Sequence, residues 1–157
     1  MTVTVNIDLG YELNVRASAK DVFAVLSDVP TSASFFPKVH RLVKLSDDVY
    51  RWEMEKVGTS QVNIQTVYAS KYKSNQAKGT VVWTPVPGEG NARVGGSWKI
   101  TDHETSTGIV LQLQGEITLP LPGLMKRVVE PLVEGEFEKL VEKYLDNLTR
   151  QFGGEID

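Results

Sequence analysis

Residues 3–15 alternate strictly between apolar and polar positions. Every odd position from Val3 to Val15 is apolar, and every even position is polar or glycine. A period of two is typical of a strand with one buried face. At about 3.3 Å per residue the run would extend roughly 40 Å, so we expect a bend or bulge at Gly10 and a curved sheet.

Two short helices are predicted after this strand. Ser18 and Asp21 resemble a capping box, and the apolar residues that follow form one side of a helix that stops before Pro30. Thr31 is the expected N-cap of a second short helix, which Pro37 ends.

Six further segments alternate in the same way and are separated by turn residues. Because the links between them are short, successive strands should be antiparallel neighbours. The predicted strands are residues 39–45, 49–57, 61–70, 78–84, 92–101 and 108–118.

The periodicity changes after the Pro-Leu-Pro-Gly stretch at residues 120–123. From Val129 to Phe152 apolar residues recur at steps of three and four, which predicts an amphipathic helix of about five turns or more. Pro131 would lie near its first turn or at a kink. The pattern therefore predicts an α+β fold in one domain, residues 1–157: a curved seven-stranded antiparallel sheet wrapped around a long C-terminal helix, with two short helices between strands 1 and 2.

Composition and charge exclude several function classes. The 157 residues include no cysteine, so thiolate catalysis and disulfides are excluded, and the net charge of -3 argues against nucleic-acid binding. No apolar stretch approaches the roughly 18 residues of a membrane span, and the N-terminus lacks the features of a signal peptide. We therefore expect no stable membrane insertion and a cytoplasmic location.

The order of these elements resembles the START-like or Bet v 1-like (SRPBCC) superfamily, specifically its polyketide cyclase/dehydrase and lipid-transport group. The likeness covers essentially the whole chain and is carried by Val15-Arg16-Ala17-Ser18-Ala19-Lys20-Asp21-Val22-Phe23 with Leu26, by Phe35-Phe36-Pro37 with Val39, by Gly95-Gly96-Ser97-Trp98 and by the C-terminal helix. The resemblance implies a helix-grip fold whose sheet and long helix enclose a cavity for a lipid, sterol, polyketide, hormone or quinone. It also implies that most members that bind such molecules are not enzymes, whereas aromatase/cyclases guide a polyketide chain through ring closure.

Alternate strand positions that would face the helix are mostly apolar, with a few hydroxyl and indole groups. The inward set is Tyr50, Trp52, Met54, Val62, Ile64, Thr66, Tyr68, Val82, Val94, Trp98, Ile109, Leu111 and Leu113. Such a set suits either a ligand cavity or a solid core, and the resemblance favours the cavity. Trp83 has the opposite parity to Val82, so the two side chains cannot both face the cavity. We therefore favour Trp52 and Trp98 over Trp83 as cavity residues.

The residues expected to bind a ligand are drawn from that set and from the C-terminal region. They are Trp52, Met54, Ile64, Thr66, Tyr68, Trp98, Leu111, Leu113, Met125, Val133 and Phe137. Candidates for the entrance of the cavity are Phe35, Phe36, Leu121, Leu124 and Met125.

A catalytic function would require a proton donor or acceptor beside the ligand. The candidates are Tyr68, Tyr50, Glu116 and His40, although His40 and Glu116 follow the polar parity of their strands and are expected to be solvated. The segment 102–104 contains Asp, His and Glu, but adjacent turn residues cannot all point at one ion. We therefore predict no metal site and no cofactor.

Three functions remain open from the sequence. The leading hypothesis is a noncatalytic binder or carrier whose partner is a small hydrophobic molecule and not a nucleic acid. The alternatives are a polyketide aromatase/cyclase or dehydratase-like enzyme and a protein-interaction module of a larger complex.

Overall fold

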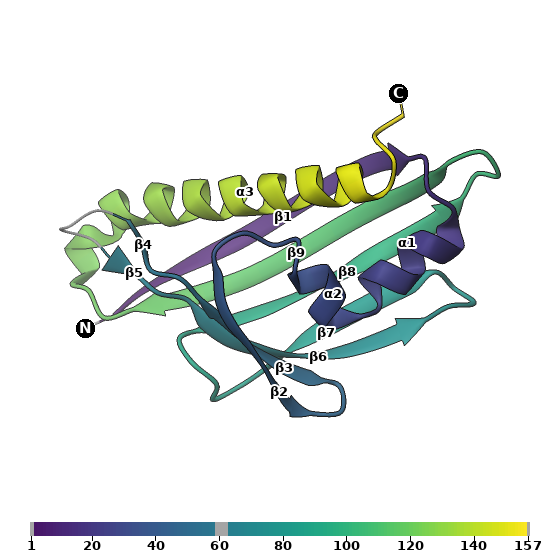
Figure 1. Ribbon diagram of the computed structural model, residues 1–157. Coiled ribbons are helices and arrows are strands. Elements are labelled where there is room, and N and C mark those ends of the chain that lie inside the picture. The colour runs from purple at the N-terminus through teal and green to yellow at the C-terminus, as the bar shows by residue number, and fades with distance from the viewer. Residues whose placement is uncertain (1, 59–62, 157) are drawn as a thin grey trace.

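A seven-stranded antiparallel sheet forms the body of the protein, for which a computed structural model describes residues 2–58 and 63–156 (Figure 1). Its strands follow the order β1-β9-β8-β7-β6-β3-β2. Their bounds are β1 Val3–Val15, β2 Val39–Ser46, β3 Val49–Met54, β6 Val67–Asn75, β7 Thr80–Val86, β8 Ala92–Asp102 and β9 Thr107–Leu119. The predicted fold class and strand number are confirmed.

The first and last strands of the sheet pair without interruption. Their register runs from Val3 opposite Leu119 to Val15 opposite Thr107 and passes Gly10 with no shift. The expected bulge at Gly10 is therefore wrong, and the register shifts lie between β2 and β3 instead. A long strand pair can follow a curved sheet through the ordinary right-handed twist, so no extra residue is needed.

The largest differences from the predicted strand boundaries affect residues 49–57 and 61–70. The segment predicted as residues 49–57 is divided, because β3 ends at Met54 and a short strand β4, Val57–Gly58, pairs with β5, Asn63–Ile64, in a separate two-stranded sheet. Gln61 and Val62 lie outside the described residues. Strand β6 continues to Asn75, beyond the predicted end at residue 70.

The two short helices have well-defined N-caps. Ser18 Oγ accepts a hydrogen bond from Asp21 N at 3.1 Å at the start of α1, Ala19–Leu26, as the capping pattern predicts. Helix α2, Val29–Ala33, is capped by Asp28, which accepts from Thr31 N at 3.4 Å. The prediction of Thr31 as N-cap is wrong, because Pro30 lies within the first turn, where its missing N–H costs nothing.

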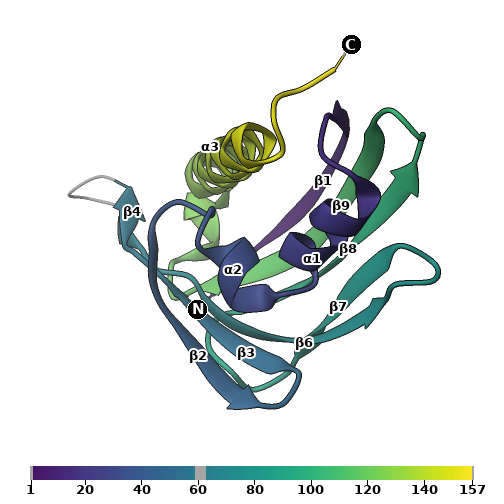
Figure 2. The same ribbon diagram turned by 45° about the vertical axis from the view of Figure 1, so that its right-hand side comes forward.

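The long helix α3, Lys126–Gln151, lies along the concave face of the sheet, after a short 3₁₀ turn η1, Gly123–Met125 (Figure 1). Pro131 lies inside α3 without ending it, and Gly153, with φ of 81°, follows its end. Helices α1 and α2 cover the concave face beside α3 (Figure 2). No helix in the described part of the chain is long and apolar enough to cross a membrane.

Candidate functional site

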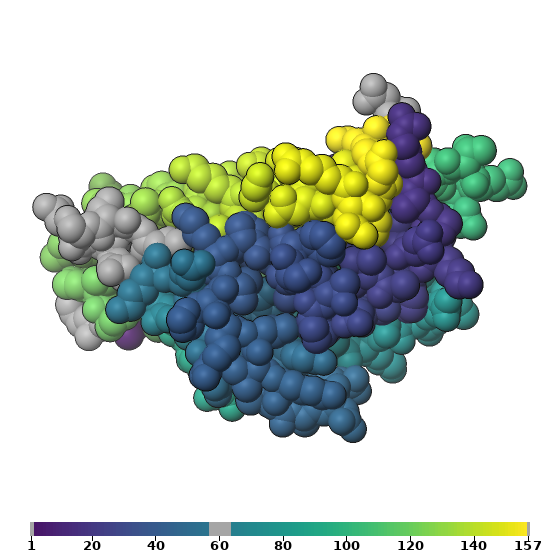
Figure 3. Space-filling model, in the orientation of Figure 1, coloured from purple at the N-terminus to yellow at the C-terminus, as the bar shows by residue number. Residues whose placement is uncertain are grey.

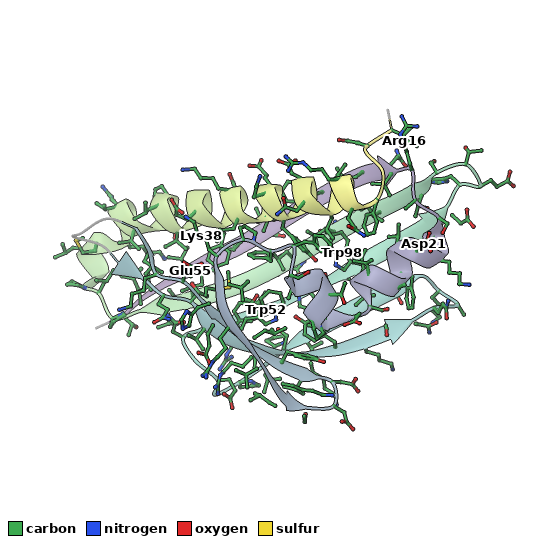
Figure 4. The ribbon with its side chains drawn as sticks, viewed as in Figure 1. Arg16, Asp21, Lys38, Trp52, Glu55 and Trp98 are labelled. Atoms are coloured by element: carbon green, nitrogen blue, oxygen red, sulfur yellow. The ribbon has the colours of Figure 1, made fainter. Side chains whose placement is uncertain are left out.

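The buried apolar residues form two clusters, one on each side of the protein interior. An internal cavity lies where these clusters meet, between the sheet, α3 and the two short helices. Its volume is about 60 Å³. The lining comes from both clusters and from every layer of the fold, and consists of Leu26, Val29, Ser32, Phe36, Trp52, Tyr68, Tyr72, Val81, Trp83, Val94, Trp98, Leu111, Leu113, Phe137, Val141 and Tyr144. Figure 4 shows Trp52 and Trp98 between the sheet and the helices.

Stacked aromatic rings form the sheet side of the cavity. Trp52 and Tyr68 are direct partners on β3 and β6, and their rings stack at 5.9 Å with an interplanar angle of 12°. Tyr72 and Trp83 are direct partners on β6 and β7 and stack at 5.9 Å. Cross-strand pairs share one face of a sheet, so these rings are held by the strand register.

A glycine gives this wall its shape. Trp83 lies opposite Gly96 on β8, and a Cβ added at Gly96 would lie 2.7 Å from the indole ring and 2.3 Å from the backbone oxygen of Gln112. Only a residue without a side chain allows Trp83 to lie over the sheet here. This is a physical reason for glycine in the Gly95-Gly96-Ser97-Trp98 segment.

Phe36, in the connection between α2 and β2, closes the cavity on the opposite side. Its ring meets Trp52 edge-on at 5.7 Å and lies 5.0 Å from Tyr144. The connection is held at both sides, because Asn147 Nδ2 donates to Phe35 O at 2.8 Å and Glu55 N donates to Lys38 O at 2.8 Å. Lys38 and Glu55 are labelled in Figure 4, and Figure 3 shows the segment from α1 to β2 packed against α3.

The polar groups of the cavity are hydroxyls and indoles. Trp52 Nε1 donates to Tyr72 Oη at 2.9 Å, and the hydroxyls of Ser32 and Tyr144 share a hydrogen bond of 2.5 Å. Tyr68 forms no hydrogen bond with another described side chain. None of the described residues lining the cavity carries a formal charge at neutral pH.

Burial raises the pKa of each of the three cavity tyrosines. It raises the pKa of Tyr68 well above its ordinary value, with smaller contributions from Tyr72 and Tyr144. Burial also raises the pKa of Tyr72, against the effect of the Trp52 hydrogen bond. The pKa of Tyr144 is raised to about 12 by burial, although the bond to Ser32 opposes the rise. The three phenols therefore ionise only at a higher pH than an exposed tyrosine does.

The structure brings many of the predicted ligand-binding residues to this cavity. Those that line it are Trp52, Tyr68, Trp98, Leu111, Leu113 and Phe137. Met54, Ile64, Thr66 and Val133 are buried outside the lining, and Met125 is partly buried against the neighbouring cluster. Of the entrance candidates, Phe36 lines the cavity, whereas Leu124 is 82% exposed.

Of the four catalytic candidates, only Tyr68 lines the cavity. Tyr50 is half-buried and packs edge-on against Tyr72, 6.0 Å away, without reaching the lining. His40 is exposed on β2, and Glu116 is half-buried on β9, opposite Arg93.

Sequence reasoning placed Val82 inward, which is wrong. Val82 is 40% exposed, whereas Trp83 is 8% exposed and lines the cavity. Val81, Val82 and Trp83 are all apolar, so alternation alone does not set the parity, and the pairing of Trp83 with Tyr72 and Gly96 decides it. Tyr72 was missed because the predicted strand ended at residue 70, although it continues the inward parity of Tyr68.

Solved structures of the same fold have low sequence identity to this chain. The Zhui aromatase/cyclase from Streptomyces sp. R1128 is 16% identical, with a TM-score of 0.75 and 94% of each chain covered. A START superfamily protein from Mycobacterium smegmatis is 19% identical, with a TM-score of 0.63, covering 92% of this chain and 97% of that one. A point mutant of norcoclaurine synthase from Thalictrum flavum, in complex with a transition-state analogue, is 16% identical, with a TM-score of 0.62 and 96% of each chain covered.

A family model covers most of the chain. No curated protein sequence matches the chain. The model of the family described as polyketide cyclase / dehydrase and lipid transport matches residues 7–153, which include most of β1, the cavity lining and all of α3. The chain therefore belongs to the polyketide cyclase / dehydrase and lipid transport family.

Proposed function

We propose that this protein binds a small hydrophobic molecule in the cavity between the sheet and α3, and acts as a binder or carrier. The lining is the observation that carries the proposal. It combines aliphatic side chains with stacked aromatic rings and a few oriented hydroxyl and indole groups, which is the composition typical of small-molecule sites. Lipid transport, which the family description includes, agrees with this function.

The volume of the cavity limits which molecules can enter it without movement of the walls. A cavity of about 60 Å³ is smaller than the roughly 150 Å³ cavity that admits benzene in another protein. Even a single aromatic ring therefore requires the walls to move. Phe36 is the wall residue best placed to move, because it is only partly buried and also borders an outer groove lined by Val39 and Tyr50.

A matched pair of neighbouring substitutions tests whether binding occurs in this cavity. Val81 lines the cavity, whereas Val82 points outward on the same strand. We expect Val81→Phe to abolish the fluorescence rise of N-phenylnaphthylamine, an uncharged apolar probe, and Val82→Phe to preserve it. Overpacking at Val81 costs stability, so circular dichroism must show a folded chain, and Leu113→Phe serves as a second blocking variant.

Two results would contradict the proposal. One is the absence of probe binding to the wild-type protein, together with an empty protein in native mass spectrometry after purification from its own host. The other is wild-type binding by folded Val81→Phe and Leu113→Phe variants, which would place the probe elsewhere.

The second candidate function is that of a polyketide cyclase, and the position of Tyr68 in the cavity favours it. The fold shared with the Zhui aromatase/cyclase is compatible with this function. A general acid or base works best with a pKa near the working pH, however, and burial raises the pKa of Tyr68 far from that range. Product analysis with a poly-β-ketone substrate would support a cyclase if the wild type changed the product distribution and Tyr68→Phe did not.

A further inference from the structure

Strand β2 leaves one edge of the main sheet open. It is the last strand in the sheet order, so among the described residues it pairs with β3 on one side only. Figure 2 shows β2 at the outer edge of the sheet. The N–H and C=O groups on the open edge of such a strand can pair with another chain.

An open groove lies beside this edge, between β2, α2 and the connection that joins them. Its volume is about 670 Å³, far larger than the internal cavity of about 60 Å³. Most of the residues that line it are apolar or aromatic, Arg41 and Lys44 are cations, and none of these described residues carries a carboxylate. The full lining consists of Pro30, Ala33, Ser34, Phe36, Val39, His40, Arg41, Leu42, Lys44 and Tyr50.

The two cations of the groove are exposed. The side chain of Arg41 is 60% exposed, although its Nη2 lies 3.0 Å from Glu53 Oε2. Glu53 also accepts a hydrogen bond from Arg51 Nε at 2.9 Å, so two guanidinium groups share this carboxylate. Lys44 forms no salt bridge with a described residue. The groove is therefore locally positive on a chain whose net charge is -3, which favours an acidic partner at this place.

The pattern of β2 favours an extended acidic segment over a second copy of the chain. Residues 41–44 pair with β3 without a register shift. Leu42 and Lys44 line the groove, whereas Val43 between them does not, as expected for alternate strand positions. A strand added beside β2 would therefore place every second side chain over the groove. The β2 strand of a second copy would bring cations against cations, which is unfavourable.

We propose that the open edge of β2 and the adjoining groove bind an extended acidic segment of a partner protein. The segment adds a strand to the sheet through backbone hydrogen bonds. Its apolar side chains lie over Leu42 and Phe36, and its carboxylates lie near Arg41 and Lys44. The cations that discourage pairing with a second copy thereby select an acidic partner. This inference is independent of which molecule the internal cavity binds.

Three capped heptapeptides separate strand addition from simple charge attraction. The acidic peptide, Glu-Val-Glu-Ile-Glu-Val-Glu, alternates carboxylates with apolar side chains. The basic peptide, Lys-Val-Lys-Ile-Lys-Val-Lys, has the same apolar residues and the opposite charge. The third peptide is the acidic one with N-methyl groups on its isoleucine and on the next glutamate, so that in either orientation one blocked nitrogen faces β2. Binding to the full chain can be followed by NMR titration at low ionic strength.

We expect the acidic peptide to bind about tenfold more tightly than the basic peptide and about fivefold more tightly than the N-methylated one. Chemical shift changes should centre on residues 41–44. Amide hydrogen exchange should slow at alternate residues of β2 in the complex, because only alternate N–H groups of an antiparallel edge strand face outward.

A charge reversal in the groove tests the same contacts from the side of the protein. Lys44→Glu should weaken binding of the acidic peptide about tenfold and strengthen binding of the basic peptide, a gain that damage to the fold does not produce. Lys73→Glu is the matched control, because Lys73 is an exposed lysine of β6 outside the groove and the two variants change the net charge equally. It should leave the peptide affinities nearly unchanged.

Several results would overturn the inference. These are failure of the acidic peptide to bind, equal binding of the acidic and basic peptides, and equal effects of Lys44→Glu and Lys73→Glu. Equal binding of the N-methylated peptide would reduce the interaction to charge attraction without an added strand. A wild-type dimer in sedimentation velocity that Lys44→Glu alters and Lys73→Glu does not would assign the edge to a second copy instead. None of these results depends on small-molecule binding, which N-phenylnaphthylamine measures separately.

Discussion

The ring of Phe36 lies 5.0 Å from the ring of Tyr144, so the connection between α2 and β2 contacts the long helix across the interior of the protein. Phe36 also meets Trp52 on the sheet, at 5.7 Å. It therefore links the aromatic groups of the helix and the sheet, and its removal should affect both stability and the size of the cavity.

Replacing Phe36 by alanine should enlarge the cavity and improve binding of N-phenylnaphthylamine. The free energy of unfolding should fall by about 2 kcal/mol, less than for a fully buried phenylalanine, because Phe36 is partly exposed. Urea denaturation and probe titration measure the two effects. Phe35→Ala is the control, since Phe35 packs on the core beside the cavity without lining it. Unchanged probe affinity in Phe36→Ala would contradict the role of Phe36 as a closing wall.

A methyl group at Gly96 should disturb the sheet side of the cavity. Gly96→Ala places a carbon 2.7 Å from the Trp83 ring, so we expect a loss of stability of about 1–3 kcal/mol and a changed tryptophan fluorescence spectrum. The control is Gly135→Ala, where the added carbon meets nothing within 4 Å and a helix interior gains roughly 0.5–1 kcal/mol. Equal stability of the two variants would show that Trp83 does not depend on Gly96.

The hydrogen bond between Ser32 and Tyr144 should connect α2 to α3 energetically. Ser32→Ala or Tyr144→Phe leaves one buried hydroxyl without its partner, so each should lower the free energy of unfolding by about 1–2 kcal/mol. The double variant should lose less than the sum, with a coupling energy of about 1 kcal/mol in a double-mutant cycle. Strict additivity in urea denaturation would show that the two hydroxyls do not act as a pair.

The buried tyrosines should make the protein sensitive to alkali. The pKa of Tyr144 is about 12 in the folded protein against 10.0 as a model value, so the folded state holds this proton more tightly. Its contribution to stability is complete below pH 10.0 and is lost as the pH rises through about 12. The loss should be on the order of 3 kcal/mol, with further loss in the same direction from Tyr68 and Tyr72.

Urea midpoints measured at increasing pH test this prediction. Tyr144→Phe should show a shallower alkaline decline than the wild type, whereas Tyr11→Phe, a change at a half-buried position, should have a smaller effect. An identical pH dependence in Tyr144→Phe and wild type would contradict the assignment to Tyr144.

The sequence determines the fold because a helix or strand that is buried on one face has apolar residues at regular intervals. The odd apolar positions of β1 and the helical spacing from Val129 to Phe152 each encode which side of an element is covered. Short links between successive strands then favour antiparallel neighbours. These local signals were sufficient to predict the helix-grip architecture.

The same periodicity identified much of the sheet side of the cavity. Trp52, Tyr68, Trp98, Leu111 and Leu113 lie on regular strand positions, and all of them line the cavity. The prediction failed where the pattern is absent, as in the apolar run at Val82 and Trp83, since only cross-strand pairing sets the orientation there.

Contacts between distant elements were decided by the tertiary structure alone. The sequence contains Phe36, Ser32 and Tyr144, but their meeting depends on how α2 and the following connection pack against α3. The volume of the cavity is likewise what remains after side chains from both layers have packed, so no local pattern encodes it. The sequence therefore determined that a sheet surrounds a helix, whereas three-dimensional packing decided that a nearly filled cavity, lined by uncharged side chains, lies between them.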